Sequence, residues 1–249
     1  MGINKEKMLL DIFHESRTNI ILGQKGVGKT NFASVLLRDL TTYGYELYTN
    51  IHFFSDDEIA LACSRGKLPK GVDYQPLPKN IHVVYKLSEL LHGLIKPGRK
   101  AVFLDEAGII SPSGTSKDTK TIKQLCYVIR HFDCAFTLIT QVAGSVPPDL
   151  REHLVDYRIK LFQAKSKARF FDVGFRKSAV DDNGEEYIHF PTIATIGPVP
   201  RSKLAYDGDF PSSFRLDLDL KKTLDGFGRL KSSLEVEKYG KAIIDKAHT

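Results

Sequence analysis

The sequence is poor in cysteine, and the spacing of the few present excludes several classes of protein. Its three cysteines, Cys63, Cys126 and Cys134, form no CxxC or zinc-ribbon pattern. A small disulfide-stapled secreted domain needs an even and dense set of cysteines. The opening stretch MGINKEKMLLDIF has acidic residues close behind a short apolar run and no small-residue cleavage site, unlike a signal peptide. We therefore expect a reduced, cytoplasmic protein.

Long apolar runs and low-complexity segments are lacking as well. No uncharged apolar stretch approaches the roughly 20 residues that a transmembrane helix requires, so we expect no membrane span. Hydrophobic residues make up 42% and charged residues 27% of the 249 residues, which is ordinary globular usage and excludes a wholly disordered chain. A chain of this length can bury a full core without disulfide or metal staples.

Acidic residues are slightly outnumbered, with 30 against 36 basic ones and a net charge of +6. This excess is compatible with a polyanionic partner. Six basic residues and one acidic residue fall between positions 160 and 177, and a second basic group follows position 116. Either group could contact DNA phosphates or be solvated surface. The candidate DNA contacts are Lys117, Lys120, Lys123, Lys165, Lys167 and Arg169.

Apolar periodicity predicts strands that alternate with helices, which is typical of an α/β sheet. A nearly all-apolar run at 101–104 indicates a strand buried on both faces of a parallel sheet. From position 169 the pattern changes to short β-like pieces with Gly, Pro and Asp-Asn-Gly turns, so we expect a core over 1–168 and a β-rich extension with a tail over 169–249. Strands are expected at 18–22, 45–51, 81–85, 101–104, 134–140, 157–162, 169–175 and 187–196, and helices at 29–40, after 86, at 121–132, 150–154 and 230–246.

A phosphate-binding loop lies between the first predicted strand and helix. Residues 23–30 read GQKGVGKT and match G-x-x-x-x-G-K-[ST], the P-loop pattern. The glycines let the backbone wrap phosphates, Lys29 neutralises their charge, and Thr30 offers a hydroxyl to Mg²⁺. The predicted nucleotide-binding residues are Gly23, Gln24, Lys25, Gly26, Val27, Gly28, Lys29, Thr30 and Asn31.

Two adjacent carboxylates end the apolar strand at 101–104. Asp105 can hold hydrated Mg²⁺, and Glu106 can polarise a water in line with the γ-phosphate as a general base. A solvated acidic turn is the alternative, but the upstream phosphate loop favours the catalytic interpretation. Together these residues predict ATP and Mg²⁺ as cofactors and hydrolysis as the reaction.

Two further polar residues are placed to complete such a site. Gln141 directly follows the strand at 134–140, where an amide could contact both water and the γ-phosphate; a solvent-facing strand end is the alternative. Arg130 ends the helix before that strand. Its spacing alone favours a helix C-terminal cation, although a guanidinium there could also reach a neighbouring subunit's nucleotide.

These residues resemble the FtsK/HerA-type P-loop ATPases, a RecA-like group, and especially their small viral genome-packaging members. The segment RHFDCAFTLITQ at 130–141 is similar to the family's arginine finger, strand and terminal glutamine, and 150–161 is similar to its next element. The resemblance implies Arg130 as a finger acting in trans and Gln141 as a sensor. It also implies double-stranded DNA as partner, a hexameric homo-oligomeric ring and docking on a capsid vertex protein.

Other functions share the same motifs. Residues 48–51 (YTNI) resemble the second strand of the filamentous-phage assembly ATPases related to zonula occludens toxin, so an ATPase that moves protein during virion assembly is the alternative. A nucleotide-switched binding module is a further alternative, against which Glu106 argues. The sequence contains no LSGGQ-like signature, which disfavours an ABC ATPase.

Overall fold

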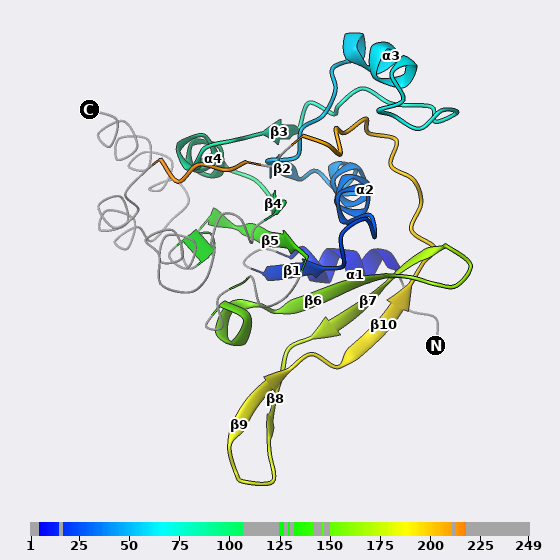
Figure 1. Cartoon of the computed structure of the whole chain (residues 1–249). Helices are drawn as coiled ribbons and strands as arrows, with labels where there is room; N and C mark the ends of the chain where they lie inside the picture. Colours follow the sequence, from blue (N-terminus) through cyan, green and yellow to red (C-terminus); the bar gives the residue numbers. More distant parts are fainter. Residues whose placement is uncertain are drawn as a thin grey trace.

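Strands and helices alternate from β1 to β4 (Figure 1). The computed structural model describes residues 5–14, 17–106, 125–126, 129, 132–141, 146, 150–210 and 213–217. The strands are β1 (Thr18–Leu22), β2 (Glu46–Thr49), β3 (Ile81–Val83), β4 (Lys100–Leu104), β5 (Cys134–Thr140), β6 (Tyr157–Gln163), β7 (Arg169–Phe175), β8 (Lys177–Val180), β9 (Glu186–His189) and β10 (Thr192–Ile196). The helices are α1 (Lys5–Ile12), α2 (Lys29–Thr41), α3 (Asp56–Ser64), α4 (Leu87–Leu94) and a π-helical turn, η3 (Leu150–Leu154).

Eight strands form one mixed sheet in the order β10-β7-β6-β1-β5-β4-β2-β3. The strands from β6 to β3 in this order pair in parallel, and β7 and β10 add to the β6 edge in antiparallel fashion. Parallel strands need crossover connections, which are usually helices, and the alternating strand and helix pattern of the sequence predicts such connections. The predicted fold class, a mostly parallel P-loop α/β sheet flanked by helices, is confirmed.

The sheet separates two hydrophobic clusters because successive strand residues point to opposite faces. On one face, Ile21 and Phe103 pack with residues of α1 and α2. On the other face, Ile20 and Val102 pack with α4 and with buried residues of the segment that precedes β5. β4 and β5 are buried along their whole length, as expected for central parallel strands. The sheet is therefore covered on both sides, and its functional residues must lie at the strand ends.

The β-rich segment after residue 168 divides between the main sheet and a separate hairpin. β7 and β10 continue the main sheet, while β8 and β9 form a separate two-stranded sheet that projects from it (Figure 1). The single strand expected over 187–196 is two strands, because Pro191 lacks a backbone donor and restricts the residue before it. The domain boundary at 168 and 169 stays a prediction.

Two helices, α1 and α3, were not predicted. α3 begins with a capping box in which Ser55 and Glu58 satisfy each other's backbone amides. The buried face of α3 is small, since Ala62 is buried while Leu61 is 49% exposed. The apolar periodicity of the sequence is therefore too weak to predict this helix. The predicted helix at 230–246 lies outside the described residues. Of the one at 121–132 the structure describes Leu125, Cys126, Ile129 and Phe132, the first three as α-helix and Phe132 as 3₁₀-helix. In the described part of the chain, no helix has the length and apolar character needed to cross a bilayer.

Candidate active site

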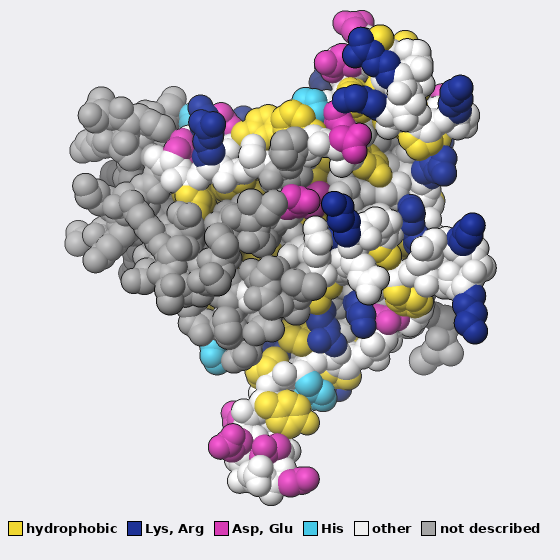
Figure 2. All heavy atoms as spheres, in the orientation of Figure 1, with side chains coloured by type: hydrophobic (Ala, Val, Ile, Leu, Met, Phe, Trp, Pro, Cys, Tyr) yellow, Lys and Arg dark blue, Asp and Glu magenta, His cyan; other side chains and the backbone are white. Residues whose placement is uncertain are grey.

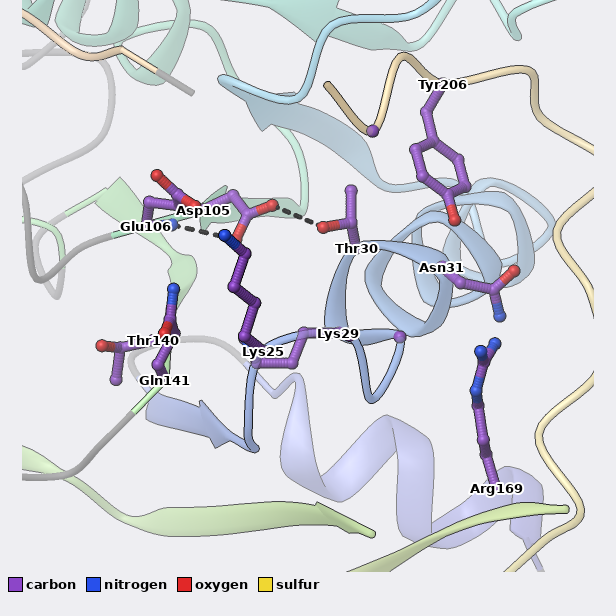
Figure 3. A pocket seen from close by; sticks show the side chains of 13 residues that line it. Lys25, Lys29, Thr30, Asn31, Asp105, Glu106, Thr140, Gln141, Arg169 and Tyr206 are labelled. Atoms are coloured by element: carbon purple, nitrogen blue, oxygen red, sulfur yellow. Dashed lines mark hydrogen bonds between the residues drawn. The ribbon is translucent and has the colours of Figure 1, made fainter. Parts of the chain in front are cut away.

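The polar residues of the motifs meet at the carboxyl ends of β1, β4 and β5, where ligands bind in open α/β sheets (Figure 3). β5 lies between β1 and β4, and Leu22 of β1 pairs with Thr140 of β5. Gln141 is thereby placed beside the phosphate loop. These ends surround a cavity of about 580 Å³ lined by Lys25, Gly26, Gly28, Lys29, Thr30, Asn31, Asp105, Glu106, Thr140, Gln141, Arg169, Tyr206 and Gly208.

The phosphate loop joins β1 to the N-terminus of α2, whose free amides and dipole favour an anion. Gly28 caps α2 with a φ of 94°, a backbone conformation that residues other than glycine rarely adopt. The Lys29 ammonium donates hydrogen bonds to the carbonyls of Gly23 and Gln24, at 2.8 and 3.2 Å. Burial lowers the pKa of Lys29, and the charges of Asp105 and Glu106 oppose this. Of the three ammonium donors, one remains for a phosphate oxygen.

The two predicted metal ligands already contact each other. The Thr30 hydroxyl donates a hydrogen bond of 2.9 Å to one carboxylate oxygen of Asp105, which is 97% buried at the end of β4. Mg²⁺ prefers hard oxygen ligands and usually takes one or two protein groups together with water and phosphate oxygens. A hydroxyl and a carboxylate that lie this close beside the phosphate loop fit that requirement. Thr30 and Asp105 would therefore hold Mg²⁺.

Asn50, for which the sequence pattern indicates no role, fixes the position of Asp105. Its amide nitrogen donates to the Asp105 carbonyl at 3.1 Å, and its amide oxygen accepts from the Asp105 backbone N–H at 2.7 Å. Asn50 is fully buried directly after β2, the strand beside β4. Burial raises the pKa of the Asp105 carboxyl, and hydrogen bonds from the Thr30 hydroxyl and Glu106 amide offset part of that effect. A bound cation would favour the ionised carboxylate.

We expect Asn50→Ala to raise the Mg²⁺ concentration needed for half-maximal nucleotide hydrolysis, because it frees the Asp105 backbone. It should also lower stability by about 1–3 kcal/mol, since two buried backbone groups lose their partner. Asn80→Ala is the matched control: Asn80 bonds the Tyr45 carbonyl at 2.8 Å, at the start of β2 and away from the cavity. Mg²⁺ titrations and denaturant unfolding measure both effects. An unchanged Mg²⁺ requirement in Asn50→Ala would contradict this positioning role.

Glu106 and Gln141 face the same part of the cavity (Figure 3). Glu106 has a φ of 53°, uncommon for a residue other than glycine, and its amide donates to the Asp105 carboxylate at 2.9 Å. Such conformations persist where the surroundings impose them and concentrate at functional sites. The structure thus brings a carboxylate and an amide into the same cavity as Lys29.

The remaining predicted site residues fall into three groups. Gly23, Gln24 and Val27 line a second hollow of about 690 Å³ on the β6 side of the phosphate loop, which Gln141 also borders. Lys165 and Lys167 are exposed in the turn between β6 and β7. Outside the described residues lie Arg130, Lys117, Lys120 and Lys123.

Asn31 and Arg169 have surroundings that the sequence did not indicate. Both polar atoms of the Asn31 amide are engaged, because its nitrogen donates to the Pro200 carbonyl and its oxygen accepts from the Ser202 amide, each at 2.9 Å. Arg169, a candidate DNA contact, lines the nucleotide cavity beside Gly28. Its DNA contact stays a prediction.

No protein-family model and no curated protein matches the sequence. Similar solved structures include the DNA-packaging ATPase B204 from Sulfolobus turreted icosahedral virus, 16% identical, which covers 72% of this chain and 98% of its own with a TM-score of 0.46. The N-terminal domain of zonular occludens toxin from Neisseria meningitidis is 17% identical over 72% of this chain and 95% of its own, with a TM-score of 0.39. The flagellar accessory protein FlaH from Methanocaldococcus jannaschii is 11% identical over 82% and 96%, with a TM-score of 0.44.

Both groups that the sequence resembles, viral packaging ATPases and zonula occludens toxin-like proteins, are therefore among the similar structures. The chain has the fold and the phosphate loop of P-loop nucleoside triphosphatases. Strand order and site residues carry that conclusion.

Proposed function

We propose that the protein hydrolyses ATP at this cavity. The observation that carries the proposal is the contact between Thr30 and Asp105 at 2.9 Å beside the phosphate loop, with Glu106 and Gln141 lining the same cavity. A pure nucleotide switch needs no second carboxylate in the cavity, and Glu106 supplies one. Mg²⁺ when bound supplies charge that neutralises the β- and γ-phosphate oxygens.

The chain's own residues divide the work of hydrolysis. The loop amides and Lys29 bind the phosphates and balance their charge. Glu106 accepts a proton from the water that attacks the γ-phosphorus, and the bond to the β-phosphate oxygen breaks, which gives ADP and phosphate. Gln141 orients that water and senses whether the γ-phosphate is present. Asp105, held by Asn50, would hold Mg²⁺ together with Thr30.

We infer further that hydrolysis drives movement of double-stranded DNA in viral genome packaging. The support is the sequence resemblance together with the basic turn between β6 and β7. Lys165 and Lys167 are exposed there, directly after β6, the strand whose last residues line the hollow beside the phosphate loop. Figure 2 shows Lys and Arg side chains along this edge of the molecule and acidic ones at the tip of the β8–β9 hairpin. The hexameric ring, with Arg130 acting in trans, and docking on a capsid vertex protein belong to the same proposal.

The test is ATP hydrolysis by the purified protein with and without double-stranded DNA, across salt concentrations. We expect DNA to stimulate hydrolysis and to bind with a steep salt dependence, because each phosphate contact releases counterions. If an oligomer of the wild-type chain shows neither effect while it hydrolyses ATP, the protein-moving assembly ATPase replaces this proposal.

Neutralising the turn identifies the DNA contact. Lys165→Gln with Lys167→Gln should reduce the salt slope of DNA binding by up to about one unit per lost phosphate contact and leave ATP affinity unchanged. Lys70→Gln with Lys79→Gln removes the same charge from exposed positions elsewhere and serves as control. Arg169 is left intact because it lines the nucleotide cavity. Equal slopes for the two double variants would exclude the turn as a contact.

A further inference from the structure

Two side chains line the end of the cavity away from the carboxylates, and neither belongs to the phosphate-binding motifs. Tyr206 and Arg169 approach this end from opposite sides, with Asn31 between them (Figure 3). They are brought together from the start of β7 and from the segment after β10, 37 positions apart in the sequence. This end of the cavity has no role in the hydrolysis scheme above.

Tyr206 lies in the segment 198–208, called the strap below, and backbone hydrogen bonds hold this segment in place. The strap pairs with the chain that follows β2: Tyr206 forms a β-bridge with Phe53, and the Phe54 amide donates to the Ala205 carbonyl at 2.8 Å. Its other end is tied to α2 by the two Asn31 hydrogen bonds at 2.9 Å. An aromatic side chain on a backbone that is fixed in this way loses less conformational entropy when it stacks on a ligand.

Arg169 is fixed through its backbone, which bonds the strap. Its carbonyl accepts a hydrogen bond of 2.7 Å from the Val199 amide of the strap. One guanidinium nitrogen lies 3.0 Å from where a Cβ on Gly28 would stand, so the guanidinium lies against the phosphate loop. Within the described part of the chain, this guanidinium forms no hydrogen bond or ion pair. Its positive charge opposes the effect of burial, which raises the pKa of Tyr206.

The position of the phosphates decides which part of a bound nucleotide Tyr206 and Arg169 contact. In the proposed hydrolysis scheme, the loop, Lys29 and Thr30 bind the β- and γ-phosphates at the carboxylate end of the cavity, so the base of the nucleotide extends toward the opposite end. The Asn31 side chain there is already engaged and cannot read the edge of a base. A tyrosine ring and a planar guanidinium are left, and both stack on flat aromatic surfaces.

We propose that Tyr206 and Arg169 hold the base of the nucleoside triphosphate by stacking. Because stacking does not read hydrogen bonds on the base edge, the site discriminates weakly between adenine and guanine. This inference rests on the proposed function, since it assumes that the phosphates bind at the P-loop.

The test compares the affinities of ATP, GTP, CTP and inorganic tripolyphosphate, measured by titration calorimetry with Mg²⁺ on the full chain. Tyr206→Ala should weaken ATP about 5-fold to 150-fold, the range for loss of one stacked base. Tripolyphosphate, which has no base, should bind Tyr206→Ala as it binds wild type. Tyr206→Phe should keep the affinity for ATP. Tyr206→Leu keeps the side-chain volume but removes the aromatic ring, so it tests stacking even if the alanine variant does not fold. Arg169→Ala should behave like Tyr206→Ala.

Three outcomes would overturn the proposal. Equal loss of ATP and tripolyphosphate binding in Arg169→Ala would place the guanidinium on the phosphates. ATP affinity unchanged in Tyr206→Leu would remove the ring from the base. A preference for ATP over GTP of 1,000-fold or more would show hydrogen-bond readout of the base edge, which reaches about 10⁴–10⁵. Failure of the proposed function looks different: wild-type protein would bind no ATP, or Lys29→Ala would bind ATP equally well.

Discussion

Replacing Glu106 by Gln should lower ATP turnover by about 10²–10⁴-fold, the usual contribution of a positioned general base. The amide of glutamine keeps the size of the side chain but cannot accept the proton of the attacking water. Because the loop, Lys29, Thr30 and Asp105 are untouched, ATP should bind as tightly as to wild type. Single-turnover hydrolysis and equilibrium nucleotide binding measure the two quantities separately.

A control for the loss of one negative charge is Glu185→Gln, at the exposed tip of the β8–β9 hairpin. It should leave both turnover and binding unchanged. Wild-type turnover in Glu106→Gln would remove Glu106 from the mechanism and favour the nucleotide-switched binding module. Loss of both binding and turnover would instead point to a disturbed backbone, since Glu106 has a φ of 53° and its amide bonds Asp105.

Arg130→Ala should lower turnover by about 10³–10⁵-fold, the contribution of an arginine finger to phosphoryl transfer. Such a finger completes the site of an adjacent subunit, so wild-type activity should rise steeply with protein concentration as the ring assembles. In an equal mixture of Arg130→Ala and Glu106→Gln chains, some interfaces join an intact Glu106 to an intact Arg130. Random assembly gives such an interface about once in four, so activity should recover to about a quarter of the wild-type rate.

The control for this mixture is Arg130→Ala combined with a chain that carries both changes. No interface then holds both intact residues, so no activity should return. If the first mixture also stays inactive although mixed oligomers form, the finger is a different arginine. Arg158 is already engaged, since it donates to the Phe190 carbonyl at 3.0 Å and lies over the Phe190 ring, so Arg151 would be tested next.

The two motifs that carry the proposed chemistry could be located from sequence because each is local. The phosphate loop needs only a strand, a glycine-rich turn and a helix within about 30 residues, and Asp105 and Glu106 need only the apolar strand before them. Asn50 carries the same kind of signal, a polar residue directly after a buried parallel strand. It was assigned no role because that signal does not say which neighbour the side chain will contact.

Local sequence pattern determined which segments form strands and helices and which loop binds phosphate, because backbone propensity and periodic burial act over a few residues. Tertiary structure alone decided the neighbours. Placing β5 between β1 and β4 brings Gln141 beside the phosphate loop, and adding β7 and β10 to the β6 edge carries Arg169 and Tyr206 to the same cavity. Contacts between residues more than a hundred positions apart depend on the packing of the whole sheet. The local sequence pattern of the strap therefore does not predict them.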